Sequence, residues 1–228
     1  MRTTHSAFIV LLLSTTAWLL TTPHLAANTP PAAPDELLRN ATLVIRRALD
    51  TSSAAIPASI MARARGLAVF PAARTDGGMY YGLGVMSARG ANPLRWTPPA
   101  VLNFRGAIPI DLDAASVDFV FVALTSRGLD YITDQMLPVP MRIHPGPLGQ
   151  DTREQMAADV VGYLEFGDYF AGVSVENWTI VGMSSANQQL YGRPYSTDEM
   201  VRGAGFFNPP PASRAWLEAL ADYFHETS

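Results

Sequence analysis

The sequence predicts an α+β protein with an antiparallel sheet, or a partly closed β-barrel, of about seven or eight strands flanked by N-terminal and C-terminal helices. Two patterns and the composition lead to this prediction. Apolar residues recur at helical spacing near both ends of the chain, and short apolar runs separated by glycine- and proline-rich turns fill the middle. The 228 residues are 48% hydrophobic and 16% charged, which is typical of a chain that buries a core.

The N-terminus has the layout of a secretory signal peptide. Arg2 supplies a positive charge, residues 7–20 form an apolar stretch, and Leu25-Ala26-Ala27 offers a small-residue cleavage site. The alternative is a membrane anchor, but residues 14–16 interrupt a stretch that is already short for a span of ~20 apolar residues. We therefore expect residues 1–27 to be removed and the mature protein to be periplasmic or secreted. Lysine is absent and arginine is frequent, which favours a GC-rich bacterial source.

A flexible, proline-rich leader is expected over residues 28–34, followed by an amphipathic helix of about four turns. Asp35 is the expected N-cap, with Glu36 in the first turn. Apolar positions recur between Leu37 and Leu49. The opposite face is polar and basic, and it carries Arg39, Asn40, Thr42, Arg46 and Arg47. Such a helix either packs on the core as a surface helix or lies on a membrane.

Turn-forming residues mark the elements that follow. A second helix is expected over residues 57–65, with Gly66 as its C-terminal stop. A buried strand over residues 67–70 should end at Pro71, and residues 75–78 have the composition of a hairpin turn.

Further strands and three helices complete the predicted order. Gly82 and Gly84 lie inside the next strand and indicate close approach of another backbone segment. The remaining strands are expected at 79–87, 101–104, 117–124, 139–143, 160–166, 169–175 and 178–183, and the helices at 126–135, 186–191 and 214–224. Residues 96–100 form a rigid corner before the strand at 101–104.

The residues that carry most enzyme chemistry are scarce. Cysteine is absent, and only His144 and His225 remain after the expected cleavage, which excludes thiolate and multi-histidine metal sites. The segment around Ser174 lacks the second glycine of a nucleophile elbow, and no glycine-rich loop precedes a helix and a lysine. Acidic residues are numerous, but no pair is singled out for glycoside hydrolysis. We therefore predict no enzymatic activity, no cofactor and no metal or nucleic-acid partner, and a hydrolase is the least favoured alternative.

Charge is distributed unevenly along the chain. Residues 37–110 contain nine arginines and two acids, a net charge of +7, whereas residues 111–228 contain six arginines and sixteen acids, a net charge of −10. Such an asymmetry indicates an anionic partner for the basic half. The alternative is that the two halves interleave in one fold and their charges pair.

An ordered set of short motifs resembles the SYLF domain family, a lipid-binding domain that also occurs in exported bacterial proteins. The motifs are Ile56-Pro57, Ala64-Arg65-Gly66-Leu67-Ala68-Val69-Phe70-Pro71, Trp96-Thr97-Pro98-Pro99-Ala100, Asp118-Phe119-Val120-Phe121-Val122, Gly146-Pro147-Leu148-Gly149-Gln150, Phe170-Ala171-Gly172-Val173-Ser174-Val175, and Ala186-Asn187 with Tyr191-Gly192. The positions taken as structural are Gly66, Phe70, Pro71, Trp96, Pro98, Gly146, Pro147, Gly149, Gly172 and Asn187. The resemblance covers residues 35–192 and leaves 193–228 as a C-terminal extension with a closing helix.

The resemblance implies binding of phosphoinositides or other anionic lipids through the basic N-terminal helical region, and no enzymatic activity. In eukaryotes it also implies ties to actin, which an exported bacterial protein would not meet. Two departures from the family pattern concern a ligand site. Residues 107–113 lack the family's glycines, and Gln150 stands where an arginine is usual.

The leading hypothesis is a non-enzymatic module that binds anionic lipid or phosphate headgroups at a membrane surface. Its expected contact residues are Arg39, Arg46, Arg47, Arg63 and Arg65. The alternative is an envelope structural or protein-interaction domain whose arginines pair only with its own acidic half.

Overall fold

The computed structural model describes residues 33–50, 56–90, 95–109, 112, 114–133, 143–146, 157–166, 169–203 and 208–226. The predicted signal peptide lies outside the described residues, as do most of the expected leader and the family positions Pro147 and Gly149.

The predicted α+β class is confirmed, with helices at both ends of the described chain. The helices are α1 (Pro34–Leu49), α2 (Ala58–Arg63), α3 (Ser126–Thr133), α5 (Ser184–Tyr191), α6 (Thr197–Val201), the 3₁₀ turn η1 (Pro211–Ser213) and α7 (Arg214–Glu226). The strands are β1 (Gly66–Asp76), β2 (Met79–Ala88), β3 (Ala100–Ala107), β4 (Ser116–Ala123), β5 (His144–Pro145), β6 (Val160–Phe166), β7 (Tyr169–Gly172) and β8 (Glu176–Gly182).

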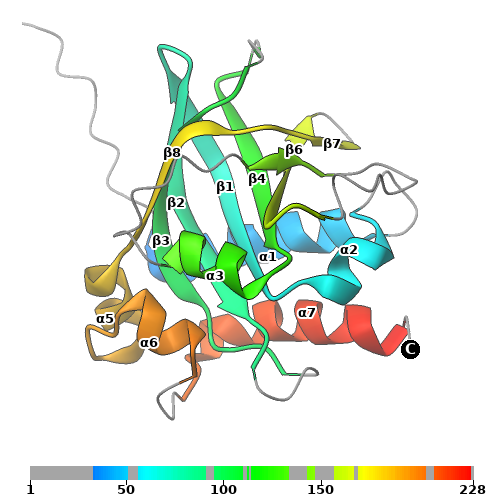
Figure 1. Ribbon diagram of the computed structural model, residues 1–228. Coiled ribbons are helices and arrows are strands. Elements are labelled where there is room, and N and C mark those ends of the chain that lie inside the picture. The colour runs from blue at the N-terminus through cyan, green and yellow to red at the C-terminus, as the bar shows by residue number, and fades with distance from the viewer. Residues whose placement is uncertain are drawn as a thin grey trace, which may run out of the picture. The chain divides into compact units, whose positions relative to one another are not determined.

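The described strands form one curled sheet in the order β5-β6-β4-β1-β2-β3-β8. Strand β7 lies off this path and pairs with residues 163–166 of β6. All pairs are antiparallel except β5 with β6. In Figure 1, α1 lies behind the curled sheet, α3 lies in front of it, and α7 runs beside α1 along the lower end. The central strand β1 therefore pairs with β4, from the second half of the chain, on one side and with β2 on the other.

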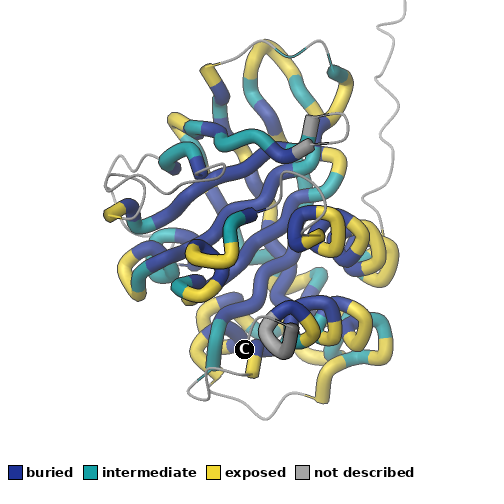
Figure 2. The backbone as a smooth tube through the Cα atoms, turned by 90° about the vertical axis from the view of Figure 1, so that its right-hand side faces the viewer, coloured by how far each residue is buried: buried dark blue, intermediate teal, exposed yellow. Residues whose placement is uncertain are grey.

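Both faces of the sheet are buried, because successive strand residues point to opposite faces. In β1, Leu67 and Val69 pack in the cluster that includes the apolar stripes of α1 and α7. Ala68 and Phe70 belong to a second cluster inside the curl. Figure 2 shows the result as buried strands between half-exposed helices.

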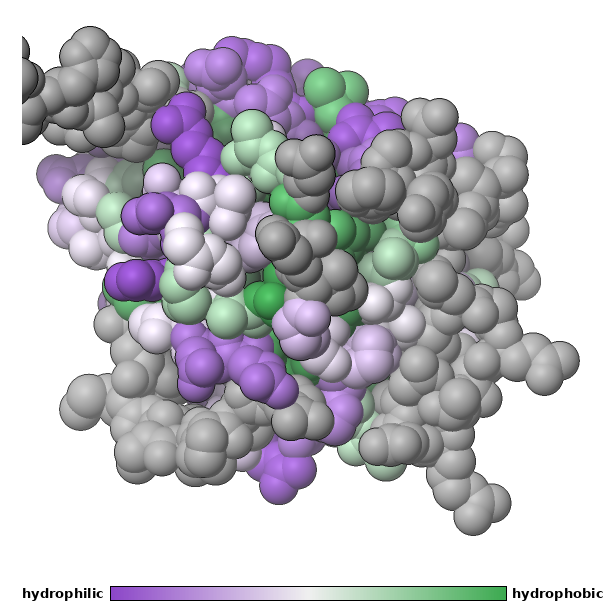
Figure 3. Space-filling view, turned by 90° about the horizontal axis from the view of Figure 1, so that it is seen from above, coloured by the Kyte–Doolittle hydropathy of each residue, from purple (hydrophilic) through white to green (hydrophobic). Residues whose placement is uncertain are grey.

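Aromatic rings fill the inside of the curl. Phe70, Phe104, Phe119 and Phe121 come from three strands, and their ring centroids lie 5.1–5.7 Å apart in tilted or edge-on pairs. Seen from above, apolar residues gather near the middle of the visible face, with hydrophilic ones above, to the left and below (Figure 3).

The expected hairpin turn and glycine contacts are confirmed. Gly77 and Gly78 have φ values of 57° and 80°, and a type I′ hairpin turn requires such positive values at both central residues. A Cβ atom added to Gly84 would lie 2.3 Å from Cδ1 of Phe70, so the interior ring occupies the space that a side chain would need.

Pro71 does not end the first strand, and that prediction is wrong. Strand β1 continues to Asp76 through a bulge, where its registers with β2 and β4 both shift. Ala72 has a φ of 50°, and its N–H donates to Oδ1 of Asp118 at 2.6 Å. A bulge accommodates proline because it interrupts the ladder of backbone hydrogen bonds.

Several helix boundaries also differ from the prediction. The N-cap of α1 is Ala33 rather than Asp35, which lies in the first turn because Pro34 occupies the first helical position. Helix α2 ends at Arg63, and Gly66 begins β1 instead of stopping the helix.

Thr42 and helix α6 are two further corrections. Thr42, expected on the polar face of α1, is buried, and its hydroxyl donates to the Leu38 carbonyl at 2.7 Å. Helix α6 was not predicted, although Ser196 and Glu199 form a capping box at its start.

The family's glycine positions are explained by close contacts. A Cβ on Gly66 would lie 2.6 Å from Cδ1 of Leu129, and one on Gly146 would lie 2.1 Å from the ring of Tyr163. A Cβ on Gly172 would lie 2.1 Å from the carbonyl oxygen of Gly146. Glycine at these positions therefore allows the backbone after β5 to lie against the end of β7.

Asn187 joins α5 to the sheet and is fully buried. Its Oδ1 accepts from the backbone N–H of Val101 at 2.8 Å, and its Nδ2 donates to the Tyr195 carbonyl at 2.9 Å. One side chain thereby fixes the start of β3 against the loop that follows α5.

We expect Phe170→Ala to lower the free energy of unfolding by ~3–5 kcal/mol, because the ring is buried in the cluster beneath α1 and α7. Urea unfolding of the purified protein measures this loss. Tyr81→Ala removes a ring that is 42% exposed and is the control, with an expected change of less than ~1 kcal/mol. Equal losses in the two variants would contradict the assignment of Phe170 to the core.

Candidate functional site

The outer face of α1 combines two arginines with an exposed leucine. Arg39, Leu43 and Arg46 follow one another at spacings of four and three residues, so they share one side of the helix. Leu43 is 56% exposed, and Leu43 and Tyr81 are the large hydrophobic residues exposed on the described part of the chain. The apolar stripe of α1 is buried in the core, so a membrane could meet only this outer face.

Arg47, at the flank of the same face, is held in an ion-pair cluster. Its Nε and Nη2 donate to the two carboxylate oxygens of Glu165 at 2.6 and 2.7 Å, and Nη2 also donates to Oδ2 of Asp118 at 3.0 Å. Asp118 of β4 and Glu165 of β6 are directly opposite each other across the strand pair. Like charges in that position destabilise a sheet, so Arg47 compensates both of them.

The environment of this cluster shifts the pKa values of Asp118 and Arg47. Burial raises the pKa of the Asp118 carboxyl, with a further rise from the neighbouring Glu165, against the lowering by the Ala72 N–H and Arg47. The hydrogen bonds that Arg47 donates to Glu165 raise the pKa of Arg47. With both acids ionised, the three side chains carry a net charge of −1, so Arg47 does not contribute the isolated positive charge that the sequence suggested.

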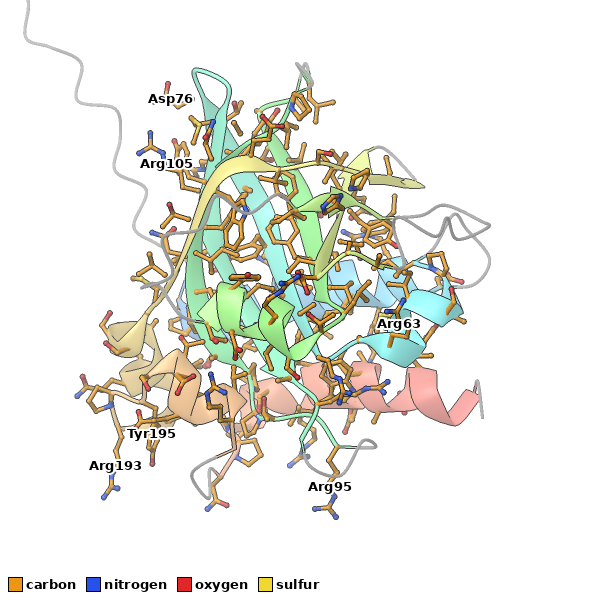
Figure 4. All side chains as sticks on the ribbon, in the orientation of Figure 1. Arg63, Asp76, Arg95, Arg105, Arg193 and Tyr195 are labelled. Atoms are coloured by element: carbon orange, nitrogen blue, oxygen red, sulfur yellow. The ribbon has the colours of Figure 1, made fainter. Side chains whose placement is uncertain are left out.

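Arg63 and Arg65 lie in a different place, a cleft of about 600 Å³ after the end of α2. The cleft is lined by Ala62, Arg63, Ala64, Arg65, Arg89, Gly90 and Leu124, with no carboxylate among these residues. Figure 4 shows Arg63 on α2, at the side of the molecule. The five expected contact residues therefore divide between the outer face of α1 and this arginine cleft.

Arg89 is a member of the cleft that sequence reasoning did not single out. Its guanidinium donates to the carbonyls of Met61 and Ala62, at 3.2 Å each, and lies 5.6 Å from the ring centre of Trp96. Burial lowers the pKa of Arg89, and the positive charge of Arg65 lowers it further. The carbonyl contacts of Arg89 lie 27 and 28 residues away in the sequence, and no local pattern indicates them.

The uneven charge along the sequence is only partly separated in space. Arg47 pairs with two acids from the second half of the chain. This agrees with the alternative that the two halves interleave in one fold and their charges pair. Other pairs stay within the second half: Arg127 with Asp159, and Arg202 with Asp130 and Asp198. The arginine cleft keeps three first-half charges together.

Two further properties concern the described residues only. No group of three or more His, Asp and Glu side chains in the described ranges is arranged to hold a metal ion. None of the described helices has the length and apolar composition needed to cross a membrane.

The family model with the description "Las17-binding protein actin regulator" (Ysc84) matches residues 112–223. The resemblance to the SYLF family is confirmed. The matched segment runs from before β4 into α7, so it includes Asp118 and Glu165 but neither α1 nor the arginines of the cleft.

Two similar proteins come from Saccharomyces cerevisiae. LAS seventeen-binding protein 3 is 29% identical over 175 residues, which cover 69% of this chain and 36% of that protein. Protein YSC84 is 28% identical over 183 residues, which cover 72% of this chain and 37% of that protein. The matched region therefore spans just over a third of the length of these relatives. No solved structure matches the chain.

We expect Arg47→Gln to destabilise the protein by ~1 kcal/mol at neutral pH, because it leaves two opposed carboxylates without their shared cation. The pKa of Asp118 is already raised in the folded state, and loss of Arg47 raises it further. Protonation of Asp118 removes the repulsion, so the loss of stability should shrink as the pH falls through that raised pKa.

Urea unfolding at several pH values measures this effect. Arg46→Gln, a neighbouring exposed residue of the same helix, is the matched control and should change stability by less than ~0.5 kcal/mol. A loss in Arg47→Gln that is the same at every pH would exclude the carboxylate pair as its cause.

Proposed function

We propose that this protein is a non-enzymatic module that binds anionic lipid headgroups at a membrane surface. The observation that carries the proposal is Leu43, an exposed leucine between Arg39 and Arg46 on a helix whose apolar stripe is already used in the core. An arginine near an anionic surface contributes ~1 kcal/mol to binding, and the leucine between them adds apolar contact with the interface.

The arginine cleft supplies a second basic surface for the same partner. Arg63, Arg65 and Arg89 line it, and arginine's planar fork suits phosphate oxygens. Local basic surfaces of this kind would allow a chain of net charge −4 to approach an anionic membrane.

A protein partner is the second candidate, because the relative LAS seventeen-binding protein 3 is named for binding a protein. The matched region covers 36% of that relative, so the name supports a protein partner for this chain only as a proposal. A domain of this kind would bind its partner equally well with or without an anionic bilayer.

We expect the mature protein to bind vesicles of phosphatidylglycerol and phosphatidylcholine, and not vesicles of phosphatidylcholine alone. The double variant Arg39→Gln/Arg46→Gln should weaken binding by ~2 kcal/mol at low salt, because two charges leave the outer face of α1. Wild-type binding should also weaken as salt rises, since the Debye length shrinks from ~30 Å at 0.01 M to ~8 Å at 0.15 M.

The matched control is Arg95→Gln/Arg193→Gln, which removes the same charge from two exposed arginines at the lower edge of Figure 4. Vesicle pelleting should give this control nearly the wild-type affinity. Equal binding to neutral and anionic vesicles, or equal losses in the two double variants, would remove the lipid proposal and favour the protein partner.

We also propose export, with cleavage near Ala27 and a periplasmic or secreted mature protein. The support is the signal-peptide layout of residues 1–27. Mass spectrometry of the protein expressed from its full sequence in a bacterium should find a chain that begins near residue 28. Recovery of the uncleaved chain in the membrane pellet would contradict this expectation.

A further inference from the structure

Two carboxylates lie beside the face of α1 that the proposed function presents to the membrane. Arg47 is one helical turn from Leu43, ~6 Å along the helix axis. The carboxylate oxygens of Asp118 and Glu165 lie 2.6–3.0 Å from its guanidinium nitrogens. The strands β4 and β6 thus bring two negative charges to the edge of the surface that presents Arg39, Leu43 and Arg46. The same side of the helix also exposes two acids, Glu36 in the first turn and Asp50 at the C-cap, seven residues before and after Leu43.

These charges act directly on an approaching anionic bilayer. With both acids ionised, the cluster of Arg47, Asp118 and Glu165 has a net charge of −1, and it becomes neutral when one proton is added. Arg47 follows Leu43 at a spacing of four residues, so the cluster that it anchors lies beside the binding face. Repulsion from the cluster therefore opposes attraction by Arg39 and Arg46.

Asp118 is the group in the cluster that is suited to take up the proton. Its neighbours are Arg47 from α1, Glu165 from β6 and the N–H of Ala72 from β1, while Phe170 of β7 lies opposite Glu165. Further charges on the packed elements are the exposed Arg46 and Asp50 of α1 and the exposed Arg74 of β1, which pairs with Ser116. Burial and the second carboxylate favour the neutral form and raise the pKa of Asp118.

We infer that the Asp118–Glu165 pair is a pH-sensitive gate for membrane attachment: one proton taken up by the pair removes the repulsion beside Leu43 and strengthens binding of α1 to anionic lipid. Arg47 keeps α1 fixed to the sheet in both states, so the fold is unchanged and only the charge at the binding face differs. The inference rests on the proposed lipid-binding function and adds its regulation.

The experiment measures binding of the mature protein to phosphatidylglycerol–phosphatidylcholine vesicles between pH 7.5 and pH 4.5 in constant salt. Asp118→Asn mimics the protonated state and keeps an oxygen that can accept from the Ala72 N–H. It should bind about fivefold more tightly than wild type at pH 7.5, the equivalent of ~1 kcal/mol for one charge. Wild type should approach the affinity of the variant as the pH falls, and the variant should change little.

Asp198→Asn is the matched control, because it removes one carboxylate that pairs with Arg202 on α6, away from this cluster. Its affinity and pH profile should match wild type. Glu165→Gln is the second variant and should also raise affinity at pH 7.5, so the test does not depend on the folding of Asp118→Asn alone.

Failure of this inference can be told apart from failure of the proposed function. If Arg39→Gln/Arg46→Gln loses binding while Asp118→Asn and Glu165→Gln both follow the wild-type pH profile, the lipid site stands and the gate is wrong. If neither wild type nor the carboxylate variants prefer anionic vesicles at any pH, both proposals are wrong. Equal gains in Asp118→Asn and Asp198→Asn would show a general charge effect and would also overturn the gate.

Discussion

Burial of both faces of the curled sheet is the constraint on which the rest of the structure depends. Because the side chains of β1 alternate, Leu67 and Val69 require cover from outside the curl while Phe70 requires partners inside it. The cover comes from α1 and α7, which uses the entire apolar stripe of α1. The same constraint decides how α1 can act, since only its outer face remains for a partner.

The cross-strand pair of Asp118 and Glu165 shows how one feature serves packing and electrostatics together. Two acids opposite each other on neighbouring strands would repel, and the guanidinium of Arg47 from α1 forms an ion pair with both of them. Arg47 thereby fixes the helix to β4 and β6. With both acids ionised, the cluster keeps a net charge of −1 at the edge of the exposed face of α1. The ion pairs that hold the helix and the proposed regulation therefore involve the same residues.

The sequence predicted those parts of the fold that local patterns control. The strand at residues 160–166 was predicted with the bounds of β6, because an apolar run between turn residues is a local signal. The predictions that failed depend on tertiary structure: a bulge carries β1 past Pro71, and packing against the core buries Thr42. Within the site, the contacts of Arg47 lie 71 and 118 residues away, and no spacing rule finds such pairs.

The arginine cleft also depends on tertiary contacts. These contacts hold three positively charged side chains near one another. Arg89 is stabilised where it lies by the carbonyl oxygens at the end of α2 and by the ring of Trp96, and neither contact neutralises its charge. Arg65 stands close enough to lower the pKa of Arg89, so the two guanidinium groups repel. An anion that entered the cleft would relieve this repulsion without breaking the contacts that hold Arg89. Under the proposed function, a phosphate group in the cleft would leave these contacts of Arg89 intact, whereas binding of the same group by Arg47 would compete with two carboxylates.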